Sequence, residues 1–408
     1  MKTPSPEACS KPSTGELPDR DLLTSCVHCG FCLEVCPTFK LTGDENNSPR
    51  GRLRLWRQEA EGKLEPDSWT DFYTAECVGC LACETACPAN VPYGRIFEHV
   101  RHDHVAGGRA KPTTVVRIAA TLIKSPRLMN LVTLPLRVLR RTGLLKHRLM
   151  FSGAPAVLKS TSDYAAELVR NHRPTGPTVM LQTGCLMEAM FREINFATVR
   201  VLIEHNVRVL VPQNQPCCGA FIEHSGLPGL EQLRQQHPDV YMGHSIDAVL
   251  TNSSGCGYSL AKSIGDRVPV RDVLSFLSEL PLRTKPKVSS DTVVYVDQPC
   301  HMIHGMKTGG IPSRVLDATG YNWKFAPHAT DCCGSGGTYN IEKPENSKEI
   351  LKRKSAFLND LKERQVILAT ANHVCMMQWS SARAMGLVNR DYQVRHVIQL
   401  LDPSTTLK

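Results

Sequence analysis

Two copies of one cysteine motif near the start of this 408-residue chain constrain its fold more than any other feature. Both copies have the spacing C-x₂-C-x₂-C-x₃-C followed by proline, which is the pattern that binds [4Fe–4S] clusters in bacterial ferredoxins. Three thiolates separated by two residues can wrap around three corners of a cubane. The fourth, at a helix start before proline, points away and binds the other cluster. We therefore predict two crossed ligand sets: Cys26, Cys29, Cys32 and Cys87 for cluster 1, and Cys77, Cys80, Cys83 and Cys36 for cluster 2.

Zinc is the alternative metal for such a pattern, because C-x₂-C pairs also bind zinc in zinc ribbons and knuckles. A zinc site needs only four ligands and does not require a third cysteine two residues on, so two complete copies favour iron–sulfur clusters. The stretch between the two runs includes Ser48-Pro-Arg-Gly-Arg52 and the helix-like RLRLWRQEAEGK. A small β-rich ferredoxin has no room for this stretch. We therefore expect a mainly helical two-cluster domain over residues 21–108.

The cysteine content supports metal binding rather than disulfide formation. The chain has 17 cysteines but no signal peptide and no apolar run long enough to span a membrane, so we expect a cytoplasmic protein. Thiols stay reduced in the cytoplasm, where clustered cysteines more often ligate metal. All except Cys9 fall into recognisable groups. Cys9 lies in a Pro- and Ser-rich leader, residues 1–20, which we expect to be disordered.

The positive charge is concentrated in one segment of the chain. Residues 104–162 contain eleven Lys or Arg and no Asp or Glu, within a net charge of +9. Apolar residues at helical spacing in IAATLIK and LVTLPLRVLRR predict a basic helical connector over residues 109–175. Such a segment suits anionic lipid at a membrane surface or an acidic partner protein, and a solvated basic linker is the alternative. No nucleic-acid-binding module is present, so we expect no nucleic-acid partner.

A second cysteine pattern repeats in the C-terminal half. A single cysteine is followed 32 residues later by Cys-Cys-Gly, and a last cysteine closes each half. Strand-like runs precede these cysteines, which places them at the strand ends where open α/β sheets bind ligands. We expect an α+β multidomain chain, in which the helical two-cluster domain precedes two tandem α/β cysteine-rich repeats at 176–285 and 286–408. The repeat cysteines are Cys185, Cys217, Cys218 and Cys256 in the first half and Cys300, Cys332, Cys333 and Cys375 in the second.

From about residue 20 to its end the chain resembles the iron–sulfur subunits of bacterial glycolate oxidase. The resemblance lies in CVHCGFC with CPTF, in GDENNSPRGR, in the second ferredoxin-type run and in the paired Cys-Cys-Gly repeats. The same layout occurs in iron–sulfur subunits of anaerobic glycerol-3-phosphate dehydrogenase and of lactate utilisation. The cysteine repeat is shared with a heterodisulfide reductase subunit.

The resemblance also bears on whether the repeats hold a further iron–sulfur centre. In the heterodisulfide reductase relative, each repeat binds such a centre through a Cys, a Cys-Cys pair and a closing C-x₂-C. Here the closing segments end in Ser259 and Gln378, so the fifth cysteine is missing from both halves. Four thiols are still enough for a metal centre. One repeat, both or neither could hold it, and the alternative is that Cys-Cys-Gly is a structural turn.

The resemblance implies a role in oxidising glycolate to glyoxylate. Oxidation of a 2-hydroxy acid needs a two-electron acceptor, which clusters alone do not provide. The chain has no G-x-G-x-x-G and no P-loop, so we expect the flavin on a partner flavoprotein and no catalytic residue for the 2-hydroxy acid here. The clusters would pass electrons onward to an acceptor such as membrane quinone. The alternatives are the same relay for lactate or glycerol 3-phosphate, and a thiol–disulfide enzyme like heterodisulfide reductase.

Overall fold

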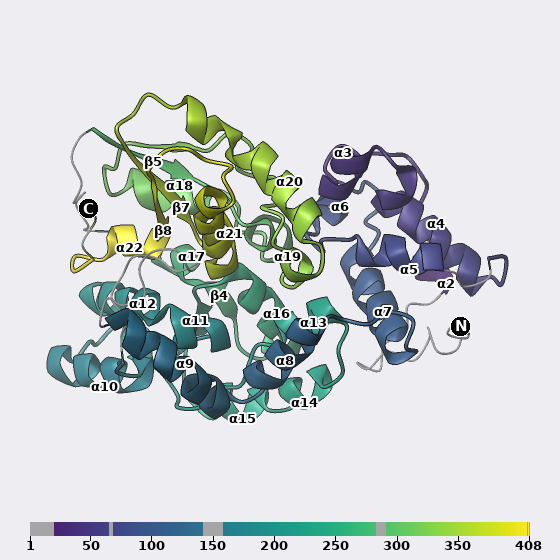
Figure 1. The fold of residues 1–408 in the computed structure, drawn as a ribbon. Coiled ribbons are helices and arrows are strands. Elements are labelled where there is room, and N and C mark those ends of the chain that lie inside the picture. Colours follow the sequence, from purple (N-terminus) through teal and green to yellow (C-terminus); the bar gives the residue numbers. More distant parts are fainter. Residues whose placement is uncertain (1–19, 65–67, 142–157, 283–290, 406, 408) are drawn as a thin grey trace. The chain divides into compact units, whose positions relative to one another are not determined.

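The computed structural model describes residues 20–64, 68–141, 158–282, 291–405 and 407, and these form two compact units (Figure 1). The first unit contains residues up to Thr121 together with Gly219–Gln232 and Asp331–Ile350. The second contains Leu122–Cys218, Leu233–Thr330 and Leu351–Lys408. The predicted leader, residues 1–20, lies almost wholly outside the described residues. The other predicted domain limits stay predictions.

The described residues of the first unit form helices joined by loops, with no strand among them, as the sequence predicts for the two-cluster domain. Ser48 starts α4, because its side-chain oxygen accepts a hydrogen bond from the backbone N–H of Gly51 and Pro49 takes the first helical position. Gly51 has no room for a side chain, since a Cβ there would collide with the carbonyl oxygen of Glu45. The helices are α2 (Arg20–Thr24), α3 (Pro37–Thr42), α4 (Pro49–Ala60), α5 (Ser68–Ala75), α6 (Ala82–Thr85), α7 (Tyr93–Ala106), α8 (Thr114–Ile123), α13 (Ala220–Ser225) and α19 (Tyr339–Glu342).

Aromatic side chains hold α4 against α7 in this unit. The ring centroid of Trp56 lies 5.7 Å from that of Tyr93 and 6.3 Å from that of Phe97. All three rings are buried, and they share a core cluster with cysteines of the second run. This packing fixes the two helices between which the cysteine loops lie.

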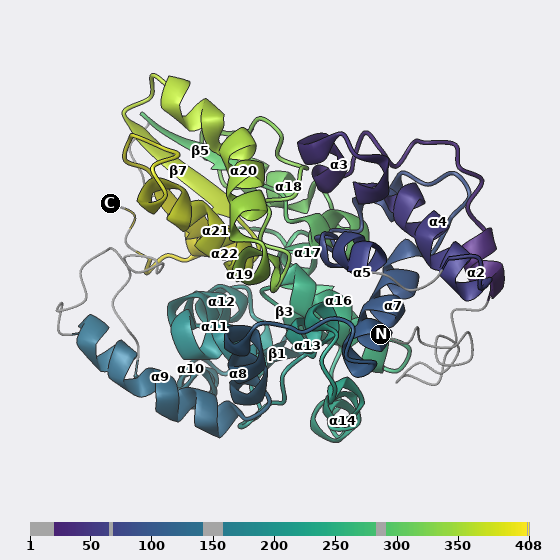
Figure 2. The same cartoon turned by 45° about the vertical axis from the view of Figure 1, so that its right-hand side comes forward.

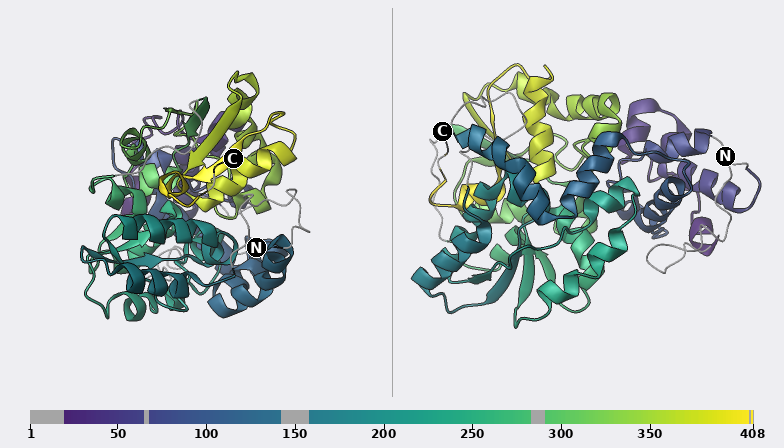
Figure 3. Two further views of the ribbon diagram at one scale, coloured as in Figure 1. Left: turned by 90° about the vertical axis from the view of Figure 1, so that its left-hand side faces the viewer. Right: turned by 60° about the horizontal axis from the view of Figure 1, so that its bottom comes forward.

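The second unit is built on two parallel four-stranded sheets with the same strand order. The orders are β2-β1-β3-β4 and β6-β5-β7-β8, so each repeat forms one sheet, as the tandem α/β prediction requires. In the right-hand view of Figure 3 the strands of the first sheet lie among their covering helices. The strands are β1 (Thr178–Gln182), β2 (Arg208–Leu210), β3 (Ala248–Thr251), β4 (Val270–Asp272), β5 (Thr292–Val296), β6 (Trp323–Phe325), β7 (Gln365–Thr370) and β8 (Gln393–His396).

Helices connect the parallel strands and bury their apolar faces. Within the first repeat α10 (Thr161–His172) and α12 (Arg192–Glu204) pack on β2, whereas α16 (Ser254–Ile264) packs on β3 and β4. Phe191, Ile194, Ala197 and Val201 are spaced to share one apolar helix face, and all four are buried. The other helices named below are α9 (Pro126–Arg141), α11 (Cys185–Met190), α17 (Val273–Leu277), α18 (Ile311–Asp317), α21 (His373–Ala384), α22 (Val397–Leu401) and the π-helical turn η2 (His301–Gly305).

The two repeats pack on each other in a reciprocal way. Helix α22, which ends the second repeat, packs on α12 of the first, and α17, which ends the first repeat, packs on α18 of the second. Arg200 on α12 forms a bidentate ion pair with Asp402, with Nε–Oδ1 and Nη2–Oδ2 distances of 2.9 and 2.6 Å. A duplicated unit that packs on its copy in this way has approximate two-fold symmetry.

The connector forms helices α8 and α9, as its apolar spacing predicts. Among the residues that the structure describes, no helix is both long and apolar enough to cross a membrane.

Candidate iron–sulfur sites

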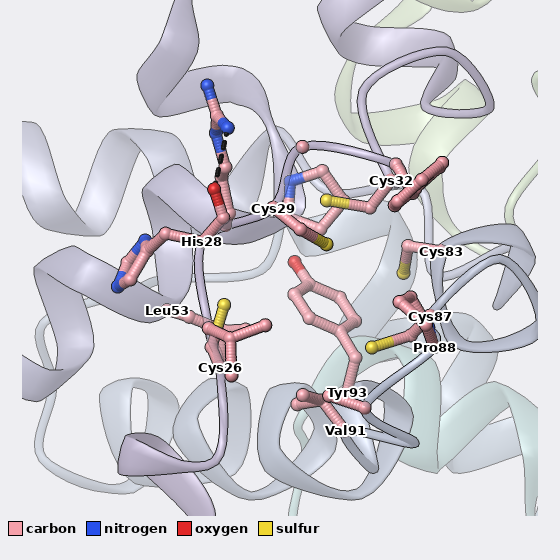
Figure 4. Close-up of a pocket in the computed structure, with 16 residues that line it drawn as sticks. Cys26, His28, Cys29, Cys32, Leu53, Cys83, Cys87, Pro88, Val91 and Tyr93 are labelled. Carbon is pink, nitrogen blue, oxygen red and sulfur yellow. Dashed lines mark hydrogen bonds between the residues drawn. The ribbon is translucent and has the colours of Figure 1, made fainter.

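The first hollow in the helical unit is lined by the cysteines predicted for cluster 1. Its walls include the loop from Cys26 to Cys32 and the segment from Cys87 to Val91 (Figure 4). Cys83 also reaches this hollow. Figure 4 shows the labelled cysteines arranged around the hollow, with the Tyr93 hydroxyl pointing in among them. The crossed ligand set is thus gathered at one place, which supports the assignment of Cys87 to the first cluster.

The second hollow is lined by the cysteines predicted for cluster 2. It is bordered by Cys36, Cys77, Cys80 and Cys83. Cys36 comes from the first run and is the N-cap residue of α3, so it stands before proline at a helix start as predicted. The ligand assignment stays a prediction, and both hollows support it.

The prediction for Cys87 is wrong in one structural detail. We expected each fourth cysteine to stand at the start of a helix, but a turn follows Cys87 and the next helix, α7, begins only at Tyr93. Proline at 88 starts a turn rather than a helix because Asn90 then takes a left-handed conformation with φ of 52°. Cys87 nevertheless lines the first hollow.

The chemistry of the thiols fits bound iron. Burial raises the pKa of Cys83 well above its usual value, and the neighbouring Cys77 and Cys36 raise it further. Burial likewise raises the pKa of Cys32 to about 11. Crowded, buried thiolates need compensating positive charge, which iron supplies when the thiols deprotonate to bind it.

Tyr93 is a residue of both sites that the cysteine motifs did not predict. Its side chain lines both hollows, and its hydroxyl donates to the Sγ of Cys77 at 3.6 Å. Burial is the largest cause and the nearby Cys77 the second of a pKa of Tyr93 that is well above its ordinary value, so the phenol stays protonated. Tyr93 lies six residues after Cys87, and this short separation from the second motif was the only signal in the sequence for its role.

The two arginines of the Ser48–Arg52 segment serve different hollows. Arg50 donates from Nη1 to the carbonyl oxygen of His28 at 3.0 Å and so braces the first loop. Arg52 is only 1% exposed and lines the second hollow. Burial alone would lower the pKa of Arg52, but Tyr93, Cys77 and Cys36 outweigh it and raise the pKa. Arg52 therefore brings a permanent positive charge to the second hollow.

Segments from both cysteine-rich repeats belong to the helical unit and contact the loop of the second run. These segments, 219–232 and 331–350, begin at or next to the two Cys-Cys-Gly motifs. A Cβ on Gly79 would lie 3.2 Å from Nδ1 of His224, and one on Gly336 would lie 2.7 Å from the carbonyl oxygen of Val78. Glu342 pairs with Arg101 on α7 at 2.9 Å. No motif signals these contacts, because the residues lie far apart along the chain.

The four thiols of the first repeat lie together in the second unit. The sulfur atoms of Cys185 and Cys217 are 3.6 Å apart, and Cys218 interacts with both Cys217 and Cys256. Cys185 begins α11 after β1, and Cys256 lies in the first turn of α16 after β3. The hydrogen bond with Cys217 is the largest cause, and burial the second, of a raised pKa of Cys185. The hydrogen bond with Cys218 lowers the pKa of Cys256. The cysteines do lie beyond the ends of adjacent parallel strands, as predicted.

The thiols of the second repeat are divided between the two units. Cys300 precedes η2 and Cys375 lies in the first turn of α21, both in the second unit. Cys332 and Cys333 belong to the first unit, where the backbone N–H of Gly334 donates to the Sγ of Cys332 at 3.4 Å. Each unit therefore holds two of the four.

Comparison with known proteins shows that the segments carrying these sites match known families. A family described as the 4Fe-4S dicluster domain matches residues 22–91, and a cysteine-rich domain family matches residues 179–261 and 294–380. The chain is 31% identical to the probable glycolate oxidase iron-sulfur subunit of Bacillus subtilis, over 88% of this chain and 89% of the relative. It belongs to the family of glycolate oxidase iron–sulfur subunits. The glycolate oxidase iron-sulfur subunit of Escherichia coli is 29% identical over 93% of this chain and 94% of its own length.

A more distant relative matches nearly the whole length of the chain. It is one of the subunits of the dihydromethanophenazine:CoB–CoM heterodisulfide reductase of Methanosarcina barkeri, and it is 22% identical over 93% of both chains. The family resemblance that the motifs suggested is thus confirmed. So is the order of one dicluster domain followed by two cysteine-rich repeats.

Proposed function

We propose that this chain is the electron-transfer subunit of a glycolate dehydrogenase or oxidase complex and passes electrons one at a time through two [4Fe–4S] clusters. The observation that carries the proposal is the pair of cysteine-lined hollows that share Cys83 and Tyr93. Two clusters held so close together serve sequential single-electron transfer. Cluster 1 would take Cys26, Cys29, Cys32 and Cys87, and cluster 2 Cys77, Cys80, Cys83 and Cys36.

The flavin and the glycolate site belong on a partner flavoprotein. Removal of hydride from glycolate needs a two-electron acceptor, which the clusters do not provide. The named relatives are iron–sulfur subunits, which fits a division between a flavoprotein that oxidises glycolate to glyoxylate and this chain. Lactate or glycerol 3-phosphate would need the same division, so the partner determines the substrate.

Electrons leave cluster 2 towards the cysteine-rich repeats in this proposal. The loop around Val78 and Gly79 contacts residues that follow both Cys-Cys-Gly motifs, which supports this direction. The first repeat, whose four thiols lie together, is the better candidate for a third centre. The final acceptor would be quinone, and the subunit would work at the inner face of the cell membrane.

The division of labour can be tested with the purified subunit, loaded with clusters under anaerobic conditions. Alone, it should not oxidise glycolate with an artificial acceptor. With its flavoprotein partner, glycolate should reduce the clusters, as followed by their visible absorbance. A Cys29→Ser variant should lose this reduction, and the matched control Cys9→Ser, outside the cysteine groups, should keep it. Turnover by the subunit alone, or cluster reduction by lactate but not by glycolate, would contradict the proposal.

A further inference from the structure

Helix α9 exposes an unusual number of large apolar side chains. Seven of its sixteen residues are leucines or valines that are 38–66% exposed, and Leu131 is the most exposed of them. Figure 2 shows α9 along the outside of the second unit, next to α11, which it contacts. Isolated apolar residues are common on protein surfaces, but a concentration on one helix marks an interaction site. The seven are Leu128, Leu131, Val132, Leu134, Leu136, Val138 and Leu139.

The side of α9 that packs against the protein is mostly polar, with Met129 as its buried apolar residue. Thr133 and Arg137 are buried, and Arg137 donates from Nη2 to the carbonyl oxygen of Asn130 at 2.7 Å. The amide oxygen of Asn130 accepts a hydrogen bond from Nη2 of Arg192 at 2.8 Å. With about 100° between successive residues, the seven apolar side chains and Pro135 lie within an arc of roughly 200° on the opposite side. This arc also contains the exposed Arg127 of the first helical turn. A helix on a water-soluble surface normally shows the reverse arrangement, with apolar residues inward.

Charge and length identify a membrane surface as the occupant. Residues 104–162 contain eleven basic and no acidic residues. Of the basic ones, Lys124 just before α9 and Arg127 in its first turn are exposed, whereas Arg109 and Arg137 are buried. An apolar face flanked by basic residues alone matches anionic lipid, whose headgroups attract Lys and Arg while the acyl chains receive Leu and Val. A helix of sixteen residues is about 24 Å long, too short to cross the hydrocarbon core of about 30 Å, so it would lie in the plane of the interface.

We propose that α9 is an in-plane membrane-binding helix, which inserts the exposed arc around Leu131 and Val138 into a bilayer of anionic lipid. The inference deepens the proposed function, since its physiological role rests on delivery of electrons to a membrane acceptor. The binding itself depends only on this helix. It does not require glycolate, a flavoprotein or cluster reduction.

Vesicle binding of the full-length, cluster-loaded chain tests this inference. The chain should co-sediment with vesicles of phosphatidylcholine and phosphatidylglycerol, and less with phosphatidylcholine alone. Leu131→Glu/Val138→Glu should weaken binding to the anionic vesicles by at least about tenfold, because it places two negative charges in the inserted arc. Phe325→Glu/Met385→Glu is the matched control. It adds the same charges at side chains 42% and 39% exposed elsewhere in the second unit and should bind like the wild type.

The remaining outcomes separate this inference from its rivals and from the proposed function. Retention of the visible spectrum of the clusters shows that each variant is folded. Equal binding by the wild type and the α9 variant, or no binding by either, overturns the inference. A wild-type dimer that the α9 substitutions dissociate would also overturn it. So would an α9 variant that no longer captures the flavoprotein but still binds the vesicles. Glycolate-dependent cluster reduction without any membrane binding would leave the proposed function standing and reject the α9 role.

Discussion

Arg52 is the residue whose charge bears most directly on the second site. Its Nε donates to the carbonyl oxygen of Tyr73 at 2.6 Å, and its Nη2 donates to Thr38 and Asn47, both at 3.2 Å. These bonds hold the guanidinium in a buried position near Cys36 and Cys77. A cluster gains negative charge on reduction, so a fixed cation beside it stabilises the reduced form.

Replacement of Arg52 by methionine should affect both stability and redox behaviour. Arg52→Met leaves buried acceptors without donors and should cost about 3 kcal/mol of stability. It should also make the reduction potential of cluster 2 more negative, by on the order of 50–100 mV. Arg54→Met, at an exposed position of the same helix, is the matched control. Anaerobic thermal unfolding and a spectroscopic redox titration measure the two effects. An unchanged potential in Arg52→Met would show that the charge is only structural.

At the level of single residues, the prediction of the ligands rests on covalent spacing. The cysteine runs could be grouped because a cubane limits the spacing of its ligands, and the hollows gather the same groups. Tyr93 and His224 could not be assigned this way. Their roles depend on contacts made through tertiary folding, and tyrosine and histidine occur in many structural settings.

At the scale of elements, the crossing of the two runs does not depend on a helix at each fourth cysteine. Cys36 stands at the start of α3, whereas Cys87 is followed by a turn, yet each lines the hollow of the other run. The packing of α4 against α7 through Trp56 and Tyr93 brings the runs together. The hydrophobic core between the helices, rather than local backbone form, therefore supports the crossing.

The crossed assignment predicts different spectroscopic effects for two otherwise identical substitutions. Cys87→Ser should perturb the cluster held by the first run, and Cys36→Ser the cluster held by the second. Each variant is the matched control for the other. Electron paramagnetic resonance of the partly reduced protein can follow the two clusters separately, with Cys29→Ser and Cys80→Ser to identify their signals. Perturbation of the opposite cluster in each variant would refute the crossing.

Short elements at the sheet edges limited the prediction of the fold. The strands that lead to the repeat cysteines were anticipated, because long apolar runs such as those of β1, β5 and β7 indicate buried parallel strands. Strands β4 and β8 were not, since VRD and QVRH are short and contain charged side chains. Both are edge strands, where polar residues are normal and the apolar signal is weak.

At the scale of the whole molecule, duplication brings equivalent cysteine-bearing helices of the two repeats together. Ser253 and Asn372 are the N-cap residues of α16 and α21, and the Ser253 hydroxyl donates to the side-chain oxygen of Asn372 at 3.3 Å. The first turns of these helices carry Cys256 and Cys375. Contacts among the thiols are seen in the first repeat, where the Sγ atoms of Cys185 and Cys217 are 3.6 Å apart and Cys218 interacts with Cys217 and Cys256.

The contacts among the thiols of the first repeat predict where a third centre would lie and how its iron would be lost. Two cubanes account for about eight irons per chain, and a third centre raises the count. Four thiols can hold a cluster only if they converge on it, which the Cys185–Cys217 distance of 3.6 Å favours in the first repeat. Anaerobic iron analysis should therefore give more than eight irons, falling to about eight in Cys217→Ser/Cys218→Ser. The matched variant Cys332→Ser/Cys333→Ser should retain the wild-type count. A count of about eight in all three proteins would make both Cys-Cys-Gly motifs structural turns, and a loss confined to the second variant would move the centre to the second repeat.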